Sequence, residues 1–316
     1  SLISYFKTSI KLLFFFYKNL SQKNSINYFT LSQGNIGIVK SFILSLISII
    51  SNNKYIVHLH RGDLIYNCKN SHFKFLIARY ILNKCFLILC ISKIQKVEIL
   101  SFFNLNRNKA IFIPNFLSKS LLLKSTSIQK NIENNHLSNF INIVYVGPLL
   151  KSKGIDKLLK ILFKDKVRDN LINNYSLSIY GRNVDKNILA RYEKEIFKNE
   201  LKYYGEVTHK KVLYNIKKSN LLILPSLSEG MPYVVLESIL LGTPVICTDV
   251  GYIKEIIGEK YPLFIDIRNK SSVIDKINYF YLNKIEIFNI IYKIREDIIK
   301  NYSKNNLKKI FDYINK

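Results

Sequence analysis

Residues 221–251 read LLILPSLSEGMPYVVLESILLGTPVICTDVG, and this pattern predicts a strand, a helix and a second strand in succession. The uncharged, apolar runs 221–224 and 244–247 are typical of strands that are buried on both faces. Between them, a helix is predicted to open at about Pro232, a favourable first-turn residue, and to end at Gly242. Strands that alternate with helices in this way form parallel sheets, so the stretch predicts an α/β fold.

The same alternation extends from this unit toward both ends of the chain. In the second half, the pattern predicts strands at 141–147, 176–180 and 201–204. It predicts helices at 153–163 and 208–217, a helix that ends at 197, a short helix before Gly258 and a helical tail after Asn283. In the first half, it predicts strands at 27–31, 55–60, 86–91 and 110–113, with helices that include 36–50 and 73–83. Segment 118–139 has the Ser-, Asn-, Lys- and Gln-rich composition of a linker. The sequence therefore predicts two Rossmann-like domains, 1–135 and 136–316, with ligand sites at the carboxyl ends of their strands.

Composition excludes several classes of protein. With 48% hydrophobic residues among 316, the chain can bury a large core and is not intrinsically disordered. Its 48 Lys and Arg against 22 Asp and Glu give a net charge of +26, so its surface should attract nucleic acid, anionic lipid or a phosphate-bearing substrate. No apolar run reaches the roughly 18 residues that a membrane span needs. Cys68, Cys85, Cys90 and Cys247 lack paired or zinc-type spacing, which indicates reduced, buried thiols in a cytosolic protein.

Two glutamates, Glu229 and Glu237, lie on either side of the point where a helix is predicted to open. The predicted helix start consists of Gly230, Met231, Pro232 and Tyr233. Backbone N–H groups at such a start suit a phosphate or a sugar oxygen. A carboxylate can hold two sugar hydroxyls, so the two glutamates could bind two sugar rings. The alternative is that one acid caps the turn and the other is a solvated residue of the helix.

Glu229 and Glu237 form an E-x7-E motif, and the stretch 222–251 around it resembles the signature of glycosyltransferase family 4. The resemblance is specific over residues 141–258. It implies the GT-B fold, in which two Rossmann-like domains face a cleft, and sugar transfer that retains the anomeric configuration. It also implies that the second domain binds a nucleoside-diphosphate sugar and the first binds the acceptor. By this resemblance, Glu229 holds hydroxyls of the donor sugar and Glu237 holds the ribose.

A second candidate site follows the strand predicted at 141–147. Gly147 would let the backbone approach a diphosphate closely, and the ammonium of Lys153 could contact that diphosphate. The family usually carries an arginine directly after the glycine, and Pro148 replaces it here. Lys151 or Arg182 could compensate for the missing charge. A solvated lysine at the start of a helix is the alternative for Lys153.

Two further turns and one histidine complete the set of candidates. By resemblance, Gly181 and Val207 border the nucleotide base, and ordinary strand–helix turns are the alternative. His60, at the end of the strand predicted at 55–60, would face the cleft, where a neutral histidine can hold or polarise a sugar hydroxyl. The resemblance points to His60 as well. His58, on the same face of the strand, is expected to be a satisfied core histidine.

Together with these observations, the resemblance implies a retaining glycosyltransferase of the hexosyltransferase type, with Glu229 and His60 as the expected catalytic residues. The expected donor is a nucleoside-diphosphate sugar, the acceptor is a saccharide or lipid-linked saccharide, and the process is cell-surface polysaccharide synthesis. We expect no cofactor and no metal, because no D-x-D triplet occurs. Two alternatives are a basic nucleic-acid-binding protein and an inactive nucleotide-sugar binder. The scattered lysines and the lack of an aromatic RNA-binding signature argue against a nucleic-acid partner.

Basic residues of the first domain predict a location at a membrane. These residues are Lys7, Lys11, Lys18, Lys69, Lys74, Arg79 and Lys84. Lysine and arginine beside apolar side chains favour reversible binding to anionic lipid, so we expect a cytoplasmic protein peripheral to the inner face of the membrane. A solvated basic surface is the alternative. Residues 1–20 predict a helix in place of the first strand that the resemblance implies, so we expect that strand to be missing.

Overall fold

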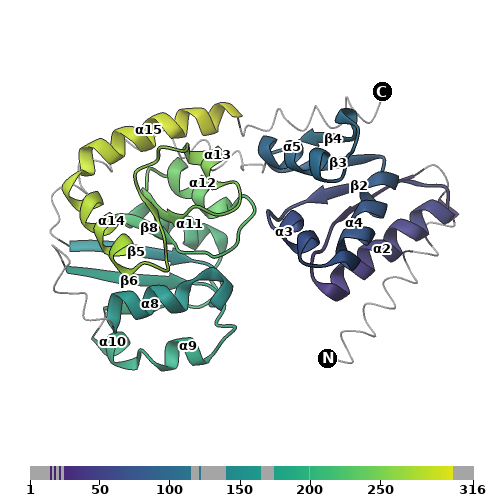
Figure 1. Cartoon of the computed structure of the whole chain (residues 1–316). Coiled ribbons are helices and arrows are strands. Elements are labelled where there is room, and N and C mark those ends of the chain that lie inside the picture. The colour runs from purple at the N-terminus through teal and green to yellow at the C-terminus, as the bar shows by residue number, and fades with distance from the viewer. Residues whose placement is uncertain are drawn as a thin grey trace. The chain divides into compact units, whose positions relative to one another are not determined.

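The computed structural model describes residues 25–114, 140–164, 174–198 and 200–301, together with 15, 18, 21, 22 and 121 (Figure 1). The chain divides into two compact units, Ser1–Pro114 and Asn115–Lys316. The boundary predicted near residue 135 falls in segment 122–139, which lies outside the described residues, as do Lys7 and Lys11 and most of the helix predicted over 1–20.

The first unit is a four-stranded parallel sheet in the order β1-β2-β3-β4, and its strands lie where the sequence predicts them. The strands are β1 (Ile26–Thr30), β2 (Lys54–Leu59), β3 (Leu87–Cys90) and β4 (Ala110–Phe112). The helices are α2 (Asn35–Ile50), α3 (Leu64–Lys69), α4 (His72–Lys84) and α5 (Lys93–Phe102), and the 3-10 turn Arg107–Lys109 precedes β4. Because every strand runs the same way, all four carboxyl ends meet at one edge of the sheet.

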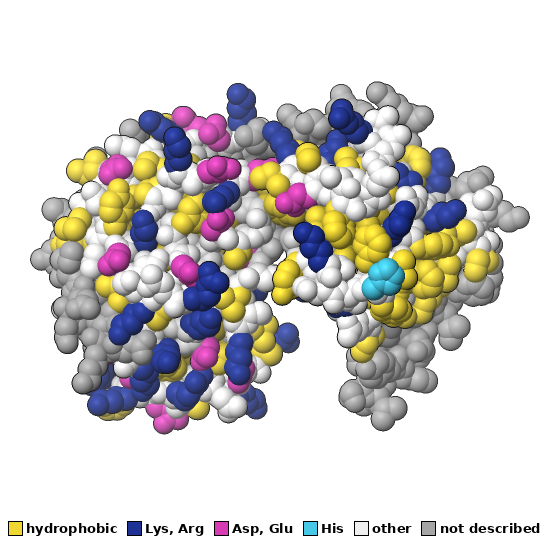
Figure 2. Space-filling model, viewed as in Figure 1, with side chains coloured by type: hydrophobic (Ala, Val, Ile, Leu, Met, Phe, Trp, Pro, Cys, Tyr) yellow, Lys and Arg dark blue, Asp and Glu magenta, His cyan; other side chains and the backbone are white. Residues whose placement is uncertain are grey.

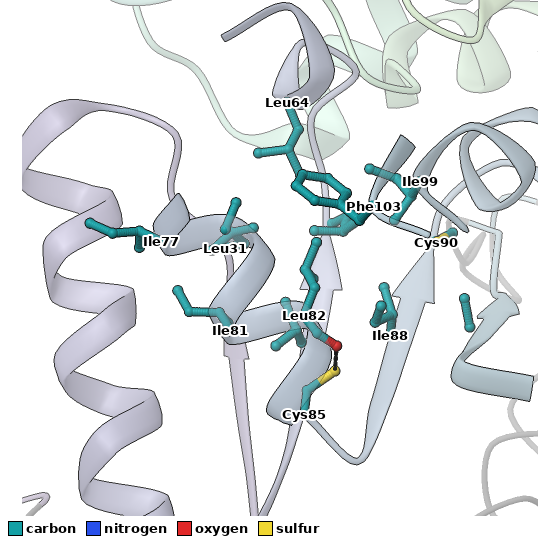
Figure 3. Packing of buried hydrophobic residues seen from close by; sticks show 14 of the residues in the cluster. Leu31, Leu64, Ile77, Ile81, Leu82, Cys85, Ile88, Cys90, Ile99 and Phe103 are labelled. Atoms are coloured by element: carbon teal, nitrogen blue, oxygen red, sulfur yellow. Dashed lines mark hydrogen bonds between the residues drawn. The ribbon is translucent and has the colours of Figure 1, made fainter. Parts of the chain in front are cut away.

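The core of the first unit forms between α4 and the sheet. Ile81 and Leu82 lie on the buried face of α4, and Figure 3 shows them in one cluster with Ile88 of β3, Ile99 and Phe103. The chain's cysteines are buried and free, as predicted: Cys68, Cys85, Cys90 and Cys247. Burial raises the pKa of Cys85 and that of Cys90 to about 12, so both thiols stay protonated at neutral pH.

The second unit is a six-stranded parallel sheet in the order β10-β9-β8-β5-β6-β7. The strands are β5 (Phe140–Val146), β6 (Asn174–Tyr180), β7 (Leu201–Tyr203), β8 (Leu221–Leu224), β9 (Val245–Thr248) and β10 (Phe264–Ile265). The chain moves outward from β5 to β7 and then returns to β8 on the other side of β5. The order of strands therefore reverses between β5 and β8, and in open α/β sheets ligands bind outside the carboxyl ends at such a point.

The helices of the second unit match the predicted pattern in part. They are α8 (Ile155–Phe163), α9 (Asn187–Ala190), α10 (Glu193–Phe197), α11 (His209–Lys218), α12 (Tyr233–Leu240), α13 (Ile253–Ile257), α14 (Lys270–Leu282) and α15 (Lys284–Asn301). The sequence reasoning missed β10 and α14, and it merged α9 and α10 into one helix. The last helix, α15, packs against α12 and α13, as Figure 1 shows.

No helix among the described parts of the chain is both long enough and apolar enough to span a bilayer.

Candidate functional site

The loops that follow β5 and β8 are in direct contact at the reversal point of the second sheet. Gly154 has a φ of +67°, and a Cβ added there would lie 1.9 Å from the carbonyl oxygen of Pro225. Only glycine fits such a close approach in the left-handed region. The Leu227 N–H also donates to the Ser152 carbonyl at 2.9 Å. These contacts fix Lys153 opposite the turn that carries Glu229.

Lys153 and Glu229 form an ion pair in the structure. Lys153 Nζ lies 2.8 Å from Glu229 Oε1, and the Ser226 hydroxyl donates to the same oxygen at 2.7 Å. The Glu229 side chain is 12% exposed and that of Lys153 is 26% exposed, so the pair is half-buried rather than solvated. The alternatives of a capping acid and a solvated lysine therefore do not describe these two residues. The sequence assigned them separate roles, and the structure brings them together.

Two hydrogen bonds from residues at and just after the end of β9 hold the turn between β8 and α12 in place. The Thr248 hydroxyl donates to the Ser226 carbonyl at 2.5 Å, and the Tyr252 N–H donates to the Gly230 carbonyl at 2.9 Å. Pro232 was predicted to open the helix, but its ψ of 122° is extended, so it is the N-cap and α12 begins at Tyr233. A proline ring fixes φ alone, and ψ stays free to leave the helical region.

The four residues of the predicted helix start differ in their exposure to solvent. Met231 is buried, whereas Tyr233 is exposed. Gly230 and Pro232 are also buried. Tyr233 is therefore the most exposed of these four residues, and the contact of this turn with a phosphate or sugar oxygen stays a prediction.

Glu237 lies on α12 and is buried, and among the described residues its side chain has one hydrogen-bond partner. His209, the first residue of α11, places Nε2 2.6 Å from Glu237 Oε1. Burial raises the pKa of Glu237, and the hydrogen bond and charge of His209 oppose that shift. Sequence reasoning missed His209, because nothing in a single sequence links a residue on one helix to a glutamate 28 positions later.

A pocket of about 400 Å³ opens at the carboxyl ends of β5, β6 and β7. It is lined by Val146, Gly147, Pro148, Tyr180, Gly181, Arg182, Glu206, Val207 and Val212. The structure thus gathers Gly147, Gly181, Arg182 and Val207, which the sequence singled out separately. A Cβ on Gly181 would lie 2.0 Å from the Gly147 carbonyl oxygen, so the two strand-end turns can meet only because Gly181 is glycine.

In the first unit, His60 directly follows β2 and is exposed. Its ring centroid lies 3.8 Å from that of His58, and desolvation lowers the pKa of His60, which therefore favours the neutral form. His58 is buried, and its Nδ1 forms a hydrogen bond of 2.6 Å with the Tyr28 hydroxyl. Its Nε2 has no hydrogen-bond partner, so His58 is a core histidine, as predicted, but only half satisfied.

A larger cavity of about 790 Å³ lies at the opposite, amino-terminal edge of the first sheet, where it is bordered by Lys54, Lys84 and Lys109. None of the predicted site residues line it. In the described residues, no group of three or more His, Cys, Asp or Glu side chains is arranged to hold a metal ion.

Acidification is expected to destabilise the protein through His58. Burial, with a smaller contribution from His60, lowers the pKa of His58 to about 3. In the unfolded chain, histidine titrates near pH 6.5, so the unfolded state alone gains this proton as the pH falls. The stabilisation is therefore complete above that pH and is lost progressively toward pH 3, by about 1.4 kcal/mol per pH unit.

Denaturant unfolding of the whole chain at pH 7 and pH 5, followed by circular dichroism, measures this effect. His58→Asn, which keeps an acceptor for Tyr28 but does not titrate, should lose less stability between the two pH values. An identical pH dependence in the variant would contradict the role of His58.

Comparisons with known proteins place the chain in a family. A family model described as "Glycosyl transferases group 1" matches residues 127–305, which include the pocket and both glutamates. The chain belongs to the group 1 glycosyl transferases. The matched segment lies entirely within the second unit, where the sequence resemblance was specific.

Curated relatives of this group 1 glycosyl transferase come from bacteria and an archaeon. A 41.2 kDa protein in the cps region of Klebsiella pneumoniae is 32% identical over 155 residues, which is 49% of this chain and 40% of that protein. The O-antigen biosynthesis glycosyltransferase WclY of Escherichia coli is 28% identical over 47% of this chain and 40% of its own length. A glycosyltransferase of Methanocaldococcus jannaschii, MJ1178, is 25% identical over 84% of this chain and 70% of its own length. The matched region thus spans about two-fifths of the Klebsiella and E. coli proteins.

Solved structures share the fold of this chain. Anabaena HepE in complex with UDP and glucose superposes with a TM-score of 0.74 at 14% identity, covering 96% of this chain and 81% of HepE. Staphylococcus aureus TarM superposes with a TM-score of 0.67 at 20% identity, covering 92% of this chain and 55% of TarM. The predicted α/β class with parallel sheets, of the GT-B type, is confirmed.

Proposed function

We propose that this protein is a retaining glycosyltransferase of family 4 that moves a sugar from a nucleoside-diphosphate sugar to a saccharide or lipid-linked acceptor. The observation that carries the proposal is the Lys153–Glu229 pair at the reversal point of the second sheet, at the same carboxyl edge of the sheet as the 400 Å³ pocket. A cation, a carboxylate and a pocket at the carboxyl ends of the strands suit a diphosphate, a sugar and a base. Relatives named for O-antigen biosynthesis favour cell-surface polysaccharide synthesis as the process.

Each part of the donor has a proposed contact. The base occupies the pocket between Gly147, Gly181 and Val207, and the ribose hydroxyls donate to Glu237. The diphosphate lies against Lys153 and the backbone of the turn 230–233. Glu229 accepts hydrogen bonds from hydroxyls of the transferred sugar. In the first unit, His60 contacts sugar hydroxyls in its neutral form.

This arrangement stabilises the charge that develops as the bond to the sugar breaks. Negative charge accumulates on the departing diphosphate, and the ammonium of Lys153 is already held nearby by Glu229. A donor that is oriented before the reaction costs no reorganisation during it, which is the basis of electrostatic catalysis. When the diphosphate binds, Lys153 must exchange Glu229 for a phosphate oxygen or contact both.

A screen of UDP, GDP and ADP, each free and joined to a hexose, tests the proposal. A ligand present at about 100 times its dissociation constant should raise the free energy of unfolding by about 2.7 kcal/mol. Transfer of the sugar to a saccharide or lipid-linked acceptor would support the proposal if NMR shows that the product keeps the anomeric configuration of the donor. An inverted product would contradict retention, and absence of both binding and turnover across the screen would contradict the donor class.

An inactive nucleotide-sugar binder is the second candidate, and Pro148 favours it. Pro148 lines the pocket where the family usually has an arginine, and only its carbonyl is bonded, to the Tyr145 hydroxyl at 3.0 Å. Binding of a nucleotide sugar without transfer to any acceptor would favour this candidate.

Pro148→Arg is expected to strengthen binding of UDP more than binding of uridine. The added guanidinium can contact the diphosphate, and a charge-assisted hydrogen bond contributes about 1.5–3 kcal/mol before losses. Calorimetric titration of both ligands measures the increment, and Pro148→Ala controls for loss of the ring. An unchanged difference between UDP and uridine would mean that another residue already supplies this contact or that the diphosphate lies elsewhere.

We further propose that the first unit binds the cytoplasmic face of an anionic membrane. Apolar side chains are exposed on α2 at Ile36, Val39, Ile43 and Ile50, and on the neighbouring helix α4 at Phe73 and Leu76. The first three recur at the spacing of a single helix face. Figure 2 shows hydrophobic side chains gathered on this unit with lysine and arginine among them. Lys74, Arg79 and Lys84 of α4 supply the positive charge.

Liposome flotation measures this membrane binding. We expect the protein to float with vesicles that contain phosphatidylglycerol and to stay unbound with neutral vesicles, because each basic residue near the surface contributes about 1 kcal/mol. Replacing Phe73 and Leu76 by serine should weaken the binding without affecting UDP affinity. Equal binding to both kinds of vesicle, or binding to neither, would contradict the proposal.

A further inference from the structure

We infer that His209 is a positioning residue for the nucleotide: it holds the carboxylate of Glu237 ionised and oriented toward the ribose. The inference rests on the proposed function, in which Glu237 contacts the ribose hydroxyls, and it adds a residue from a different helix to that contact. His209 begins α11, which packs beside α12, and its Nε2 lies 2.6 Å from Glu237 Oε1.

The two oxygens of Glu237 are not equivalent. Oε1 is bonded to His209, whereas Oε2 has no hydrogen bond within the described part of the chain. An ionised carboxylate has several acceptor sites, so a contact at one oxygen leaves the other able to accept from a hydroxyl. Fixing one oxygen also prevents the carboxylate from rotating away, which lowers the ordering cost when a ligand binds. The free oxygen is therefore the one that the ribose would use.

His209 also counters an unfavourable consequence of burial. Glu237 is buried, and an isolated buried carboxyl favours its neutral form, which is a poorer acceptor. A donor N–H from His209 favours the ionised form. The His209 side chain itself is 63% exposed, so replacing it removes this hydrogen bond and little packing. A variant of His209 should therefore fold normally and lose affinity for the nucleotide.

The experiment compares His209→Ala with His209→Gln. The amide Nε2 of glutamine can occupy nearly the position of the histidine Nε2 and donate the same hydrogen bond. His209→Ala should weaken UDP binding by about fivefold to tenfold, the net effect of losing one typical hydrogen bond, and His209→Gln should restore most of it. In turnover, His209→Ala should raise KM for the nucleotide sugar and leave kcat nearly unchanged, because the ribose does not react.

His72→Ala is the matched control, because His72 is also an exposed histidine at the first position of a helix, α4. It should leave UDP affinity unchanged. In Glu237→Gln, the further change His209→Ala should have no additional effect, because the two residues act through one contact.

The outcomes separate this inference from the proposed function. If Glu237→Gln weakens UDP binding and His209→Ala does not, His209 has no positioning role and the ribose contact of Glu237 stands. If alanine and glutamine at position 209 weaken binding equally, the hydrogen bond is not the cause, and the inference is wrong. If Glu237→Gln itself leaves UDP affinity unchanged, the proposed ribose contact fails, and the inference fails with it.

Discussion

Lys153→Met is expected to lower kcat/KM for the nucleotide sugar by about 100- to 1,000-fold, the loss found when one preorganised donor is removed from a developing negative charge. Methionine keeps most of the side-chain volume and removes only the ammonium. In the structure that ammonium is fixed by Glu229 and by the contact between the loops after β5 and β8. Little of its contribution can therefore be replaced by a mobile surface lysine.

The same substitution leaves Glu229 without its cation. The Glu229 side chain is 12% exposed, so an unpaired charge there is unfavourable. We therefore expect Lys153→Met to impair binding of the diphosphate and, through Glu229, recognition of the sugar. Steady-state kinetics and UDP titration measure the two effects. Lys160→Met, at an exposed lysine on α8, is the control, and equal activity in the two variants would contradict the role of Lys153.

Glu229→Gln and Glu237→Gln are expected to impair different steps. In the proposed function, Glu237 contacts the ribose, whose interactions change little during the reaction, so its loss should raise KM and weaken UDP binding. In the proposed function, Glu229 contacts the transferred sugar, whose geometry changes, so its loss should lower kcat by about 100-fold. Because Glu229 pairs with Lys153 before any ligand binds, removing its charge should also release the lysine. UDP affinity should then be unchanged or increased in Glu229→Gln, opposite to Glu237→Gln.

UDP titration and steady-state turnover of both variants measure this division, with Glu259→Gln, at an exposed acid beyond α13, as the control. Loss of UDP affinity in Glu229→Gln alone would reverse the assignment. If neither variant changed either quantity, both glutamates would be structural, and the motif would no longer support the proposed enzyme.

The sequence predicted the strands because buried parallel strands are continuous apolar runs that end at glycine or proline. The runs before Gly147, Gly181 and Pro225 show this, and β5, β6 and β8 lie where expected. The short strand β10 has two residues, too few for any periodic signal. The helix α14 is partly polar and follows no strong turn, so its weak pattern was missed.

The candidate site could be predicted residue by residue but not as a set of contacts. The motif and the strand-end glycines identified Glu229, Glu237, Gly147 and Gly181, because those signals are local. The pairing of Lys153 with Glu229 joins residues 76 positions apart, and it depends on Gly154 passing close to the Pro225 carbonyl. Such a contact depends on how the loops pack at the edge of the sheet, and a local sequence pattern does not reveal it. The same reason accounts for His209, which the sequence did not single out.

The burial of all four native cysteines makes the protein suited to site-specific labelling. Thiol reagents attack the thiolate, and burial raises the pKa of each of these thiols and shields it from the reagent. Cysteines introduced at exposed positions, such as Ser101 on α5 and Lys157 on α8, should therefore react with a maleimide dye while the native ones stay unmodified. Energy transfer between two such dyes, one in each unit, would then follow any movement between the units as a nucleotide sugar binds, in the native sequence background.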